Sequence, residues 1–241
     1  MKVRIGRLAV LVAFALAVTP LWAGNYTGVG NYSARDIPSG FFSGFDVTAN
    51  GKFVGLVGSD INLYSADGVY ERTIGSVPDY STSAEWGAFC RLSPDESEVW
   101  VGLTIGGNTD DRIYNVPFAG GTPVHQATLP GCFDLEFRQV TGVWKPFVSG
   151  LGVAGTWDNA VWLLDTVADD HTKIVDIGGY SAGIDFDSAG NLFGGHAVNK
   201  VLYKWAAADI DGVIGGASAL DTTDASWSTP IDGGPYDITI D

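Results

Sequence analysis

The sequence is poor in basic residues, histidine and cysteine, and each shortage narrows the choice of function. It has 13 Lys and Arg against 28 Asp and Glu, a formal net charge of −15. A chain this acidic repels nucleic acid and anionic membrane surfaces, so we expect neither as a partner. The three histidines, His125, His171 and His196, show no metal-ligand spacing. Gly-x-Ser-x-Gly occurs once, at residues 179–183, between two predicted strands and not on the strand-to-helix turn that a nucleophile elbow needs, and no Gly-x-x-x-x-Gly-Lys-Ser/Thr phosphate loop is present.

Long hydrophobic runs are missing after the N-terminus, and residues 1–23 have the layout of a secretory signal peptide. Lys2, Arg4 and Arg7 precede an apolar segment of eleven residues, 8–18, and Ala23 offers a small residue for cleavage. Eleven residues of helix span about 16 Å, half of a bilayer core, which disfavours the alternative of a membrane anchor. We predict cleavage near Ala23 and a secreted chain, extracellular or periplasmic. It keeps 218 residues and a charge of −18, without a transmembrane segment.

Only two cysteines occur, Cys90 and Cys132. An oxidising compartment permits a disulfide between them, and they lie 42 residues apart, close to one repeat of the pattern described next. In the alignment of the repeats, however, they are one position out of register, so their side chains can face opposite ways. The disulfide and two buried thiols are both left open.

Glycine is plentiful, at 33 residues, and recurs in short turns between alternating apolar and polar stretches. Residues 183–193 predict a strand, a tight turn and a second strand, and residues 44–54 have the same shape. Rough equivalents recur at spacings of 45, 43, 51 and 54 residues: Asp46, Arg91, Asp134, Asp185 and Thr239.

Short strands in units of about 40–50 residues are typical of a β-propeller, in which each four-stranded sheet covers its neighbours. A β-sandwich does not require turn chemistry that recurs at a near-constant period. We therefore predict an all-β propeller of four-stranded antiparallel blades, with about four blades and the start of a fifth, or a piece of a longer propeller. The expected units are 41–80, 81–130, 131–179, 180–234 and a fragment, 235–241, after an N-terminal arm or lead-in strand at 24–40. Helical spacing predicts a short helical insert near 206–214.

Two hairpins carry a family resemblance. Residues 186–193, Phe-Asp-Ser-Ala-Gly-Asn-Leu-Phe, resemble the hairpin of NHL-type propellers, and Leu92-Ser93-Pro94-Asp95 followed by Val99-Trp100-Val101 resembles that of YVTN and TolB-like propellers. The resemblance covers most of residues 41–241, but its motifs mark structure. It implies a fold shared by scaffolds, ligand binders, lactonases and lyases, and leaves the function open.

In a propeller, the connectors that precede the innermost strands and the loops between second and third strands share one face, which we call the channel face. The positions at the innermost strands are Asp46, Arg91, Asp134 and Asp185, and the loops supply Asp60, Asp110, Asp111, Asp158, His196 and Asn199. Converging carboxylates are suited to Ca²⁺, with Asp46, Asp134 and Asp185 as predicted metal ligands. The alternative is that these short acids accept backbone N–H bonds and hold the local structure.

Other ligand-binding candidates on this face are Arg91, His196, Trp86 and Trp157, the two tryptophans as stacking platforms. Catalysis has one candidate pair, His196 as a general base beside Asp185. The main hypothesis is an exported, non-enzymatic propeller that binds a protein partner or a small-molecule ligand on the channel face. The alternatives are a metal-dependent hydrolase or lyase that uses the aspartates and His196, and a cell-surface structural module that is a fragment of a longer chain.

Overall fold

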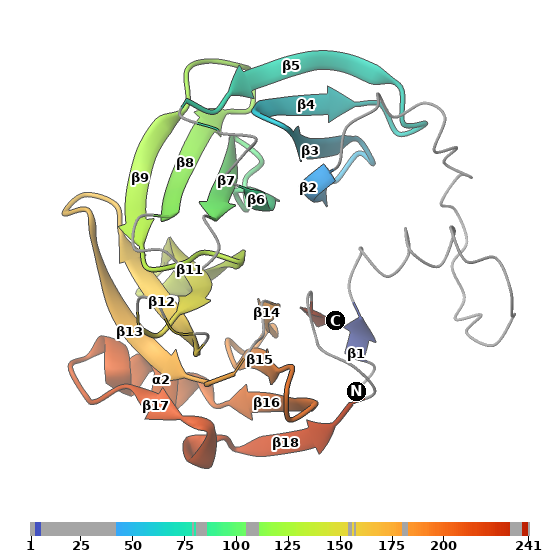
Figure 1. Cartoon of the computed structure of the whole chain (residues 1–241). Helices are drawn as coiled ribbons and strands as arrows, with labels where there is room; N and C mark the ends of the chain where they lie inside the picture. Colours follow the sequence, from blue (N-terminus) through green and yellow to red (C-terminus); the bar gives the residue numbers. More distant parts are fainter. Residues whose placement is uncertain are drawn as a thin grey trace, which may run out of the picture.

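The computed structural model describes residues 3–5, 42–78, 80, 86–104, 111–153, 156, 158–179, 183–231 and 238–240. Four antiparallel sheets follow one another around a common centre, as the sequence predicts, and we number them blades 1 to 4 (Figure 1). Blade 1 contains β2 (Phe42–Val47), β3 (Phe53–Val57), β4 (Asp60–Tyr64) and β5 (Tyr70–Ser76). Blade 2 contains β6 (Trp86–Leu92), β7 (Glu98–Thr104), β8 (Asp111–Pro117) and β9 (Val124–Leu129). Blade 3 contains β10 (Asp134–Val140), β11 (Val143–Leu151), β12 (Asn159–Asp165) and β13 (Asp170–Asp176). Blade 4 contains β14 (Ile184–Phe186), β15 (Leu192–His196), β16 (Val201–Trp205) and β18 (Trp227–Pro230).

In each blade the first strand along the chain lies nearest the centre, and the later strands follow in chain order toward the outer edge (Figure 1). The hairpin of blade 4 shows why the local sequence folds this way. Gly190 has a φ of +80°, and Asp187 accepts hydrogen bonds from the N–H groups of Ala189 and Asn191 at 3.0 and 2.9 Å. A side chain that caps its own turn, followed by a glycine in the left-handed region, reverses the chain after β14 and starts β15.

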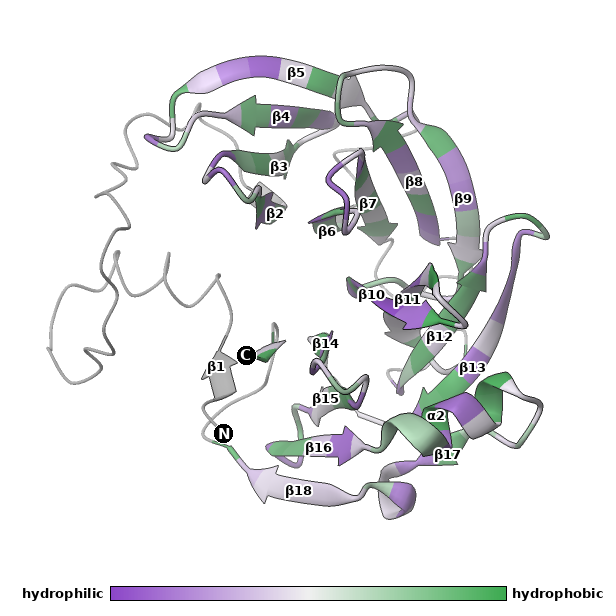
Figure 2. Ribbon diagram, turned by 180° about the vertical axis from the view of Figure 1, so that it is seen from behind, coloured by the Kyte–Doolittle hydropathy of each residue, from purple (hydrophilic) through white to green (hydrophobic). Residues whose placement is uncertain are grey.

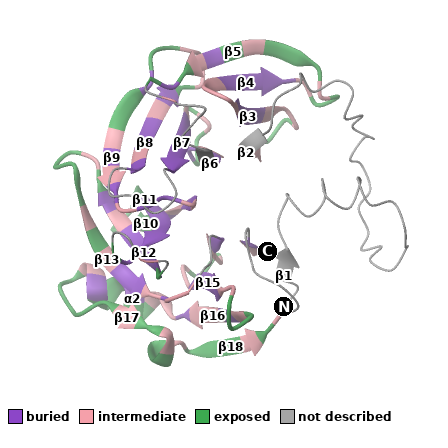
Figure 3. Cartoon of the chain, viewed as in Figure 1, coloured by how far each residue is buried: buried purple, intermediate pink, exposed green. Residues whose placement is uncertain are grey.

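The apolar core lies between the blades, because each sheet has an apolar face on both sides. Val54 and Leu63 of blade 1 pack with Val101 of blade 2 in one cluster, and similar clusters join blades 2 and 3 and blades 3 and 4. Hydrophobic residues follow the strands of every blade (Figure 2), and the exposed residues gather on the outer strands, such as β5, β9 and β18 (Figure 3). The interfaces between blades therefore hold the molecule together.

The predicted helical insert is present as α2 (Ala207–Ile214). It is followed by β17 (Leu220–Asp221) and the short 3-10 helix η1 (Thr222–Asp224), before β18 completes blade 4. The sequence does not predict the course of this segment: β17 pairs in parallel with β13 and adds a fifth strand to blade 3. The insert therefore links the outer edges of two blades.

Beyond blade 4, β19 (Ile238–Ile240) occupies the place predicted for the opening strand of a fifth blade (Figure 1). Ile238 packs with Phe193 and Leu202 of blade 4. β19 pairs antiparallel with β1 (Val3–Ile5), three residues of the predicted leader, whose cleavage remains a prediction. The predicted arm at 24–40 lies outside the described residues, and no helix among the described residues is long and apolar enough to cross a membrane.

Candidate functional site

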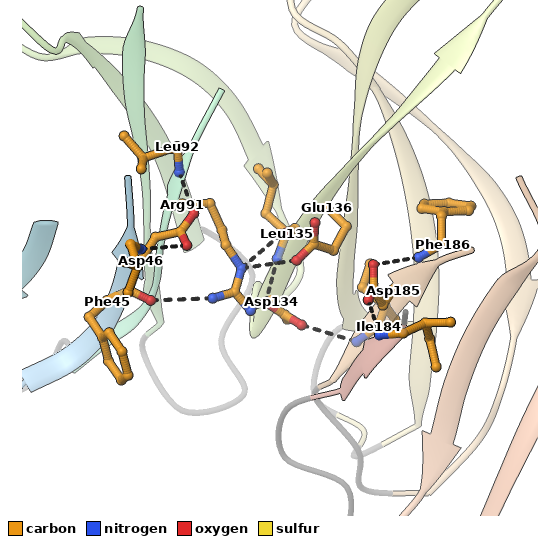
Figure 4. A network of polar contacts seen from close by, with 12 residues as sticks. Phe45, Asp46, Arg91, Leu92, Asp134, Leu135, Glu136, Ile184, Asp185 and Phe186 are labelled. Carbon is orange, nitrogen blue, oxygen red and sulfur yellow. Dashed lines mark hydrogen bonds and ion pairs between the residues drawn. The ribbon is translucent and has the colours of Figure 1, made fainter. Parts of the chain in front are cut away.

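The residues that the repeat spacing aligns lie where a channel site requires them, on the innermost strands of the four blades. Asp46 lies on β2, Arg91 on β6, Asp134 on β10 and Asp185 on β14 (Figure 4). What these side chains bind decides whether they form a ligand site.

Asp46 joins the first two blades. Its Oδ1 accepts a hydrogen bond from the N–H of Val47 at 2.7 Å, and its Oδ2 accepts one from the N–H of Leu92 in the next blade at 3.0 Å. The two innermost strands lie so close together that only glycine fits at position 44: a Cβ added there would lie 2.5 Å from the backbone nitrogen of Cys90. The carboxylate therefore satisfies amide donors of both strands.

Asp185 makes the same contact at the other end of the chain. Its Oδ1 accepts from the N–H of Phe186 and its Oδ2 from the N–H of Ile240 in β19, both at 2.6 Å. The bond to Ile240 ties β19 to blade 4 in the way that blade 2 is tied to blade 1. This supports the interpretation of β19 as the innermost strand of a further blade.

Asp134 is buried and ties blade 3 to blade 4 through a hydrogen bond from the N–H of Ile184 to its Oδ2, at 3.0 Å. Its Oδ1 accepts from its neighbour's N–H, that of Leu135, at 2.9 Å, and from the guanidinium of Arg91 at 2.7 Å. Arg91 stands where the other blades carry aspartate, and its side chain is only 13% exposed. It also forms an ion pair with Glu136 at 3.2 Å and donates to the carbonyl oxygen of Leu135 (Figure 4).

These contacts show how the predicted metal ligands Asp46, Asp134 and Asp185 are engaged, and their role as metal ligands stays a prediction. The carboxylates of Asp46, Asp134 and Asp185 bind along the ring, each to backbone amides of two successive innermost strands. The guanidinium of Arg91 neutralises Asp134 and repels a cation at that position. Among the described residues there is no group of three or more His, Cys, Asp or Glu that could hold a metal ion. The alternative in which short acids accept backbone N–H bonds accounts for these contacts.

The proposed catalytic pair is engaged in separate contacts. His196 ends β15, where its Nδ1 accepts a hydrogen bond from the N–H of Asn199 at 3.1 Å and its Nε2 lies 3.3 Å from the Asn199 amide nitrogen. The carboxylate of Asp185 is bonded to the amides of Phe186 and Ile240. The ring of His196 lies directly against Gly179, in the connector between blades 3 and 4.

The disulfide alternative for Cys90 and Cys132 is wrong in this structure, where both are free and buried thiols. Cys90 packs in the cluster between blades 1 and 2, and Cys132 packs in the cluster between blades 2 and 3. The one-position offset in register accounts for this difference, since it turns the two side chains toward different interfaces. Burial raises the pKa of Cys90 to about 12 and raises that of Cys132 well above its usual value.

The two candidate tryptophans lie at the limits of the described chain. The backbone of Trp86 begins β6 and pairs with Thr104, but its side chain is outside the described part, and Trp157 is outside the described residues altogether. Trp205, with a fully buried side chain, and Trp100 and Trp162, which are largely buried, pack between blades, whereas Trp144 and Trp227 are 49% and 40% exposed.

Two buried polar residues at the start of third strands are functional candidates on the channel face. Asp111, which the sequence places in a loop, is buried and accepts bonds from the hydroxyl of Thr104 at 2.7 Å and from the N–H of Cys132 at 3.2 Å. Asn159 was missed by the sequence reasoning. It is 1% exposed, and neither its amide nitrogen nor its amide oxygen has a hydrogen-bond partner among the described residues. Asn159 begins the third strand of blade 3 as Asp111 begins the third strand of blade 2, and this equivalence in the repeat is the sequence signal for it.

Known proteins resemble this chain in structure and not in sequence. No protein-family model matches the chain, and no curated protein matches its sequence. A gluconolactonase from Xanthomonas campestris superposes with a TM-score of 0.57 at 14% identity, over 81% of this chain and 64% of that one. A luciferin-regenerating enzyme gives a TM-score of 0.54 at 13% identity, over 79% and 66%. A calcium-binding protein, regucalcin from Agrobacterium tumefaciens, gives 0.52 at 13%, over 70% and 57%.

The chain is a β-propeller by fold. At these identities the likeness concerns the propeller fold alone, since one fold hosts many unrelated functions. The chain spans 57% to 66% of the length of these three proteins. What their names say of catalysis or calcium belongs to them.

Proposed function

We propose that this propeller is an exported, non-enzymatic binding protein that holds a protein partner or a small-molecule ligand on its channel face. The observation that carries the proposal is the use of the innermost-strand carboxylates. Asp46, Asp134 and Asp185 each bond the backbone of two successive innermost strands. They act as ties of a scaffold, and recognition falls to the connectors and loops around them.

The channel face of blades 3 and 4 offers side chains for recognition. Asp158 and Asn199 are exposed there, and Val153 and Val198 are 58% and 64% exposed. Polar groups and small apolar surfaces that rigid sheets hold in place are typical of a binding face. The acidic chain favours neutral or basic ligands and opposes nucleic acid.

The alternative hydrolase or lyase receives less support from the contacts. Such an enzyme needs a carboxylate that holds a metal or positions a base, whereas Asp185 bonds two amides and His196 bonds Asn199. A calcium-binding role draws on the resemblance to regucalcin and on the acidic composition. The remaining alternative, a structural module of a longer cell-surface chain, draws on the coverage of longer propellers.

The test compares one change on the channel face with a matched change on the opposite face. Asp158→Lys alters the loop between β11 and β12, and Asp67→Lys makes the same charge change at an exposed turn between β4 and β5. The purified chain is labelled and applied to arrays of neutral glycans and of short peptides. We expect binding that Asp158→Lys weakens by about tenfold and Asp67→Lys leaves unchanged. Equal effects of the two variants would contradict the proposal.

A second measurement addresses the enzymatic alternative. The chain is assayed against simple esters and lactones, with His196→Ala as the comparison. We expect no turnover above the rate in buffer. Turnover that His196→Ala abolishes would establish the enzyme and overturn the non-enzymatic proposal.

A further inference from the structure

Blades 2 and 3 each carry a polar residue at the start of the third strand, and of these two side chains only that of blade 2 has hydrogen-bond partners among the described residues. Asp111 begins β8 and Asn159 begins β12, each as the first residue of a third strand. In blade 2 the last residue of the preceding strand, Thr104, donates its hydroxyl to Asp111 at 2.7 Å. In blade 3 the residue paired with Asn159 in that place is Leu151, which has no hydroxyl.

The consequence is an amide group with no hydrogen bonds in a buried position. The Asn159 backbone is fully engaged, because its N–H donates to Gly179 at 3.0 Å and its carbonyl accepts from Ile177 and Gly178 at 2.8 and 2.9 Å. Its side chain is 1% exposed and lacks a partner among the described residues. Burying such a group without a partner costs about 1–3 kcal/mol, so its retention calls for an explanation.

The surroundings of Asn159 connect it to the channel face. Gly178 and Gly179 have φ values of +71° and +59°, a conformation that bulkier residues adopt rarely, and they lie in the connector that leads to blade 4. The ring of His196, half-buried, lies against Gly179 from the side of blade 4. The contact of Gly179 with His196 marks a seam between blades 3 and 4, and Asn159 is hydrogen-bonded through its backbone to that connector. The exposed Asn199 is hydrogen-bonded to His196 on the other side of the seam.

We propose that this seam binds a neutral, hydroxyl-bearing small molecule, with Asn159 as the residue that recognises one of its hydroxyl groups. A primary amide both donates and accepts hydrogen bonds, and so does a hydroxyl group. Blade 2 shows that a hydroxyl satisfies this register position when the chain supplies one. The acidic chain disfavours an anionic ligand, and an amide in place of the blade 2 carboxylate disfavours a cation. The inference rests on the proposed binding at the channel face and names its ligand class.

The experiment restores the missing hydroxyl inside the chain. Leu151→Thr places a hydroxyl where blade 2 has that of Thr104, and Leu151→Val shortens the same side chain without adding one. The side-chain amide resonances of Asn159 are followed by NMR in the full chain and assigned by their loss in Asn159→Leu. The probes are glycerol, myo-inositol and D-glucose.

We expect at least one probe to shift the Asn159 amide resonances saturably in the unaltered chain and in Leu151→Val. Leu151→Thr should weaken that binding by about tenfold, because its own hydroxyl occupies the amide. Where Leu151→Thr does not fold, the decision passes to Asn159→Leu, which should abolish the probe's effect on neighbouring resonances such as those of Gly179.

Two results would overturn the inference. One is the absence of a shift with all three probes while the amide protons show cross-relaxation with water, which would mean that solvent satisfies Asn159. The other is equal affinity of Leu151→Thr and Leu151→Val for a probe. The array test of the proposed function can still succeed when either of these results is obtained. The failure of this site is therefore distinguishable from the failure of the proposed function.

Discussion

At the scale of single residues, the inner ring shows how one short acidic side chain can join two blades. One carboxylate oxygen of an aspartate on an innermost strand accepts a hydrogen bond from the N–H of the following residue, and the other accepts one from an N–H of the next blade. The second bond connects strands that share no sheet pairing. Loss of the side chain therefore leaves amide donors without partners at an interface.

Asp46→Ala should lower the free energy of unfolding by about 2 kcal/mol, because the N–H groups of Val47 and Leu92 lose their acceptor. Asp46→Asn keeps one acceptor oxygen and should lie between Ala and the unaltered chain. Asp60→Ala is the control, since Asp60 is half-buried and accepts a single bond, from the Ser76 hydroxyl, within its own blade. Urea unfolding measures all three, and a cost for Asp60→Ala as large as that for Asp46→Ala would count against the tie.

The two thiols provide a second residue-scale prediction. Burial raises the pKa of Cys90 to about 12 and that of Cys132 well above its usual value, so the reactive thiolate is scarce at neutral pH. We expect iodoacetamide to label neither residue in the folded protein and both in urea. Mass spectrometry of the non-reduced protein gives the readout, and a mass lower by the hydrogens of two thiols would show a disulfide instead.

At the scale of elements, the turn of blade 4 links local sequence to pH. Burial alone would raise the pKa of Asp187, but hydrogen bonds from Asn191 and Lys204 outweigh it and lower this pKa below its ordinary value. The carboxylate therefore stabilises the fold at pH values above the ordinary pKa of aspartate, about 4, and this contribution disappears as the pH falls through the lowered pKa. We expect Asp187→Asn to be destabilising at pH 7 and to converge on the unaltered chain in acid. A cost that does not change between pH 7 and acid would contradict this account.

The insert of blade 4 depends on one buried arginine of blade 3. Arg138 forms an ion pair with Asp211 of α2 at 2.8 Å and donates to the carbonyl oxygen of Ala207 at 3.4 Å. Arg138→Ala should raise hydrogen exchange across α2 by about tenfold, because local opening then costs less. Lys145→Ala, a change at an exposed position of blade 3, should leave that exchange unchanged. Unaltered exchange in Arg138→Ala would contradict this, and would show that the apolar contacts of Ile210 and Val213 suffice to hold α2 in place.

The same scale shows which elements the sequence can predict. Alternation of apolar and polar residues, with Asn-Gly and Asp-Gly turns, predicts β3 and its neighbours because the period of two and the turn chemistry are local properties. The parallel pairing of β17 with β13 is not local, and two residues carry no signal for it. The positions of Asp46, Asp134 and Asp185 follow from the repeat, whereas their partners do not. Spacing indicates which residues share a register, but the atoms opposite them depend on how the blades pack.

At the scale of the whole molecule, the repeat explains how the blades hold together. Apolar clusters fill each interface between blades, and the inner carboxylates cross the same interfaces at the centre. Asn159 departs from this pattern, because Leu151 faces it where blade 2 has a hydroxyl. The comparison of blades, which needs the structure, is what reveals this departure.

We propose, as the central claim, that the inner aspartates tie blades together and do not hold a metal. Urea unfolding of the unaltered chain and of Asp134→Ala, each with and without Ca²⁺, tests it most directly. We predict that Asp134→Ala loses about 3 kcal/mol, because it strips a buried carboxylate from Arg91 and two amides, and that Ca²⁺ leaves the unaltered chain unchanged. A Ca²⁺-dependent stabilisation of the unaltered chain that disappears in Asp134→Ala, with little loss of stability in the absence of Ca²⁺, would contradict the claim.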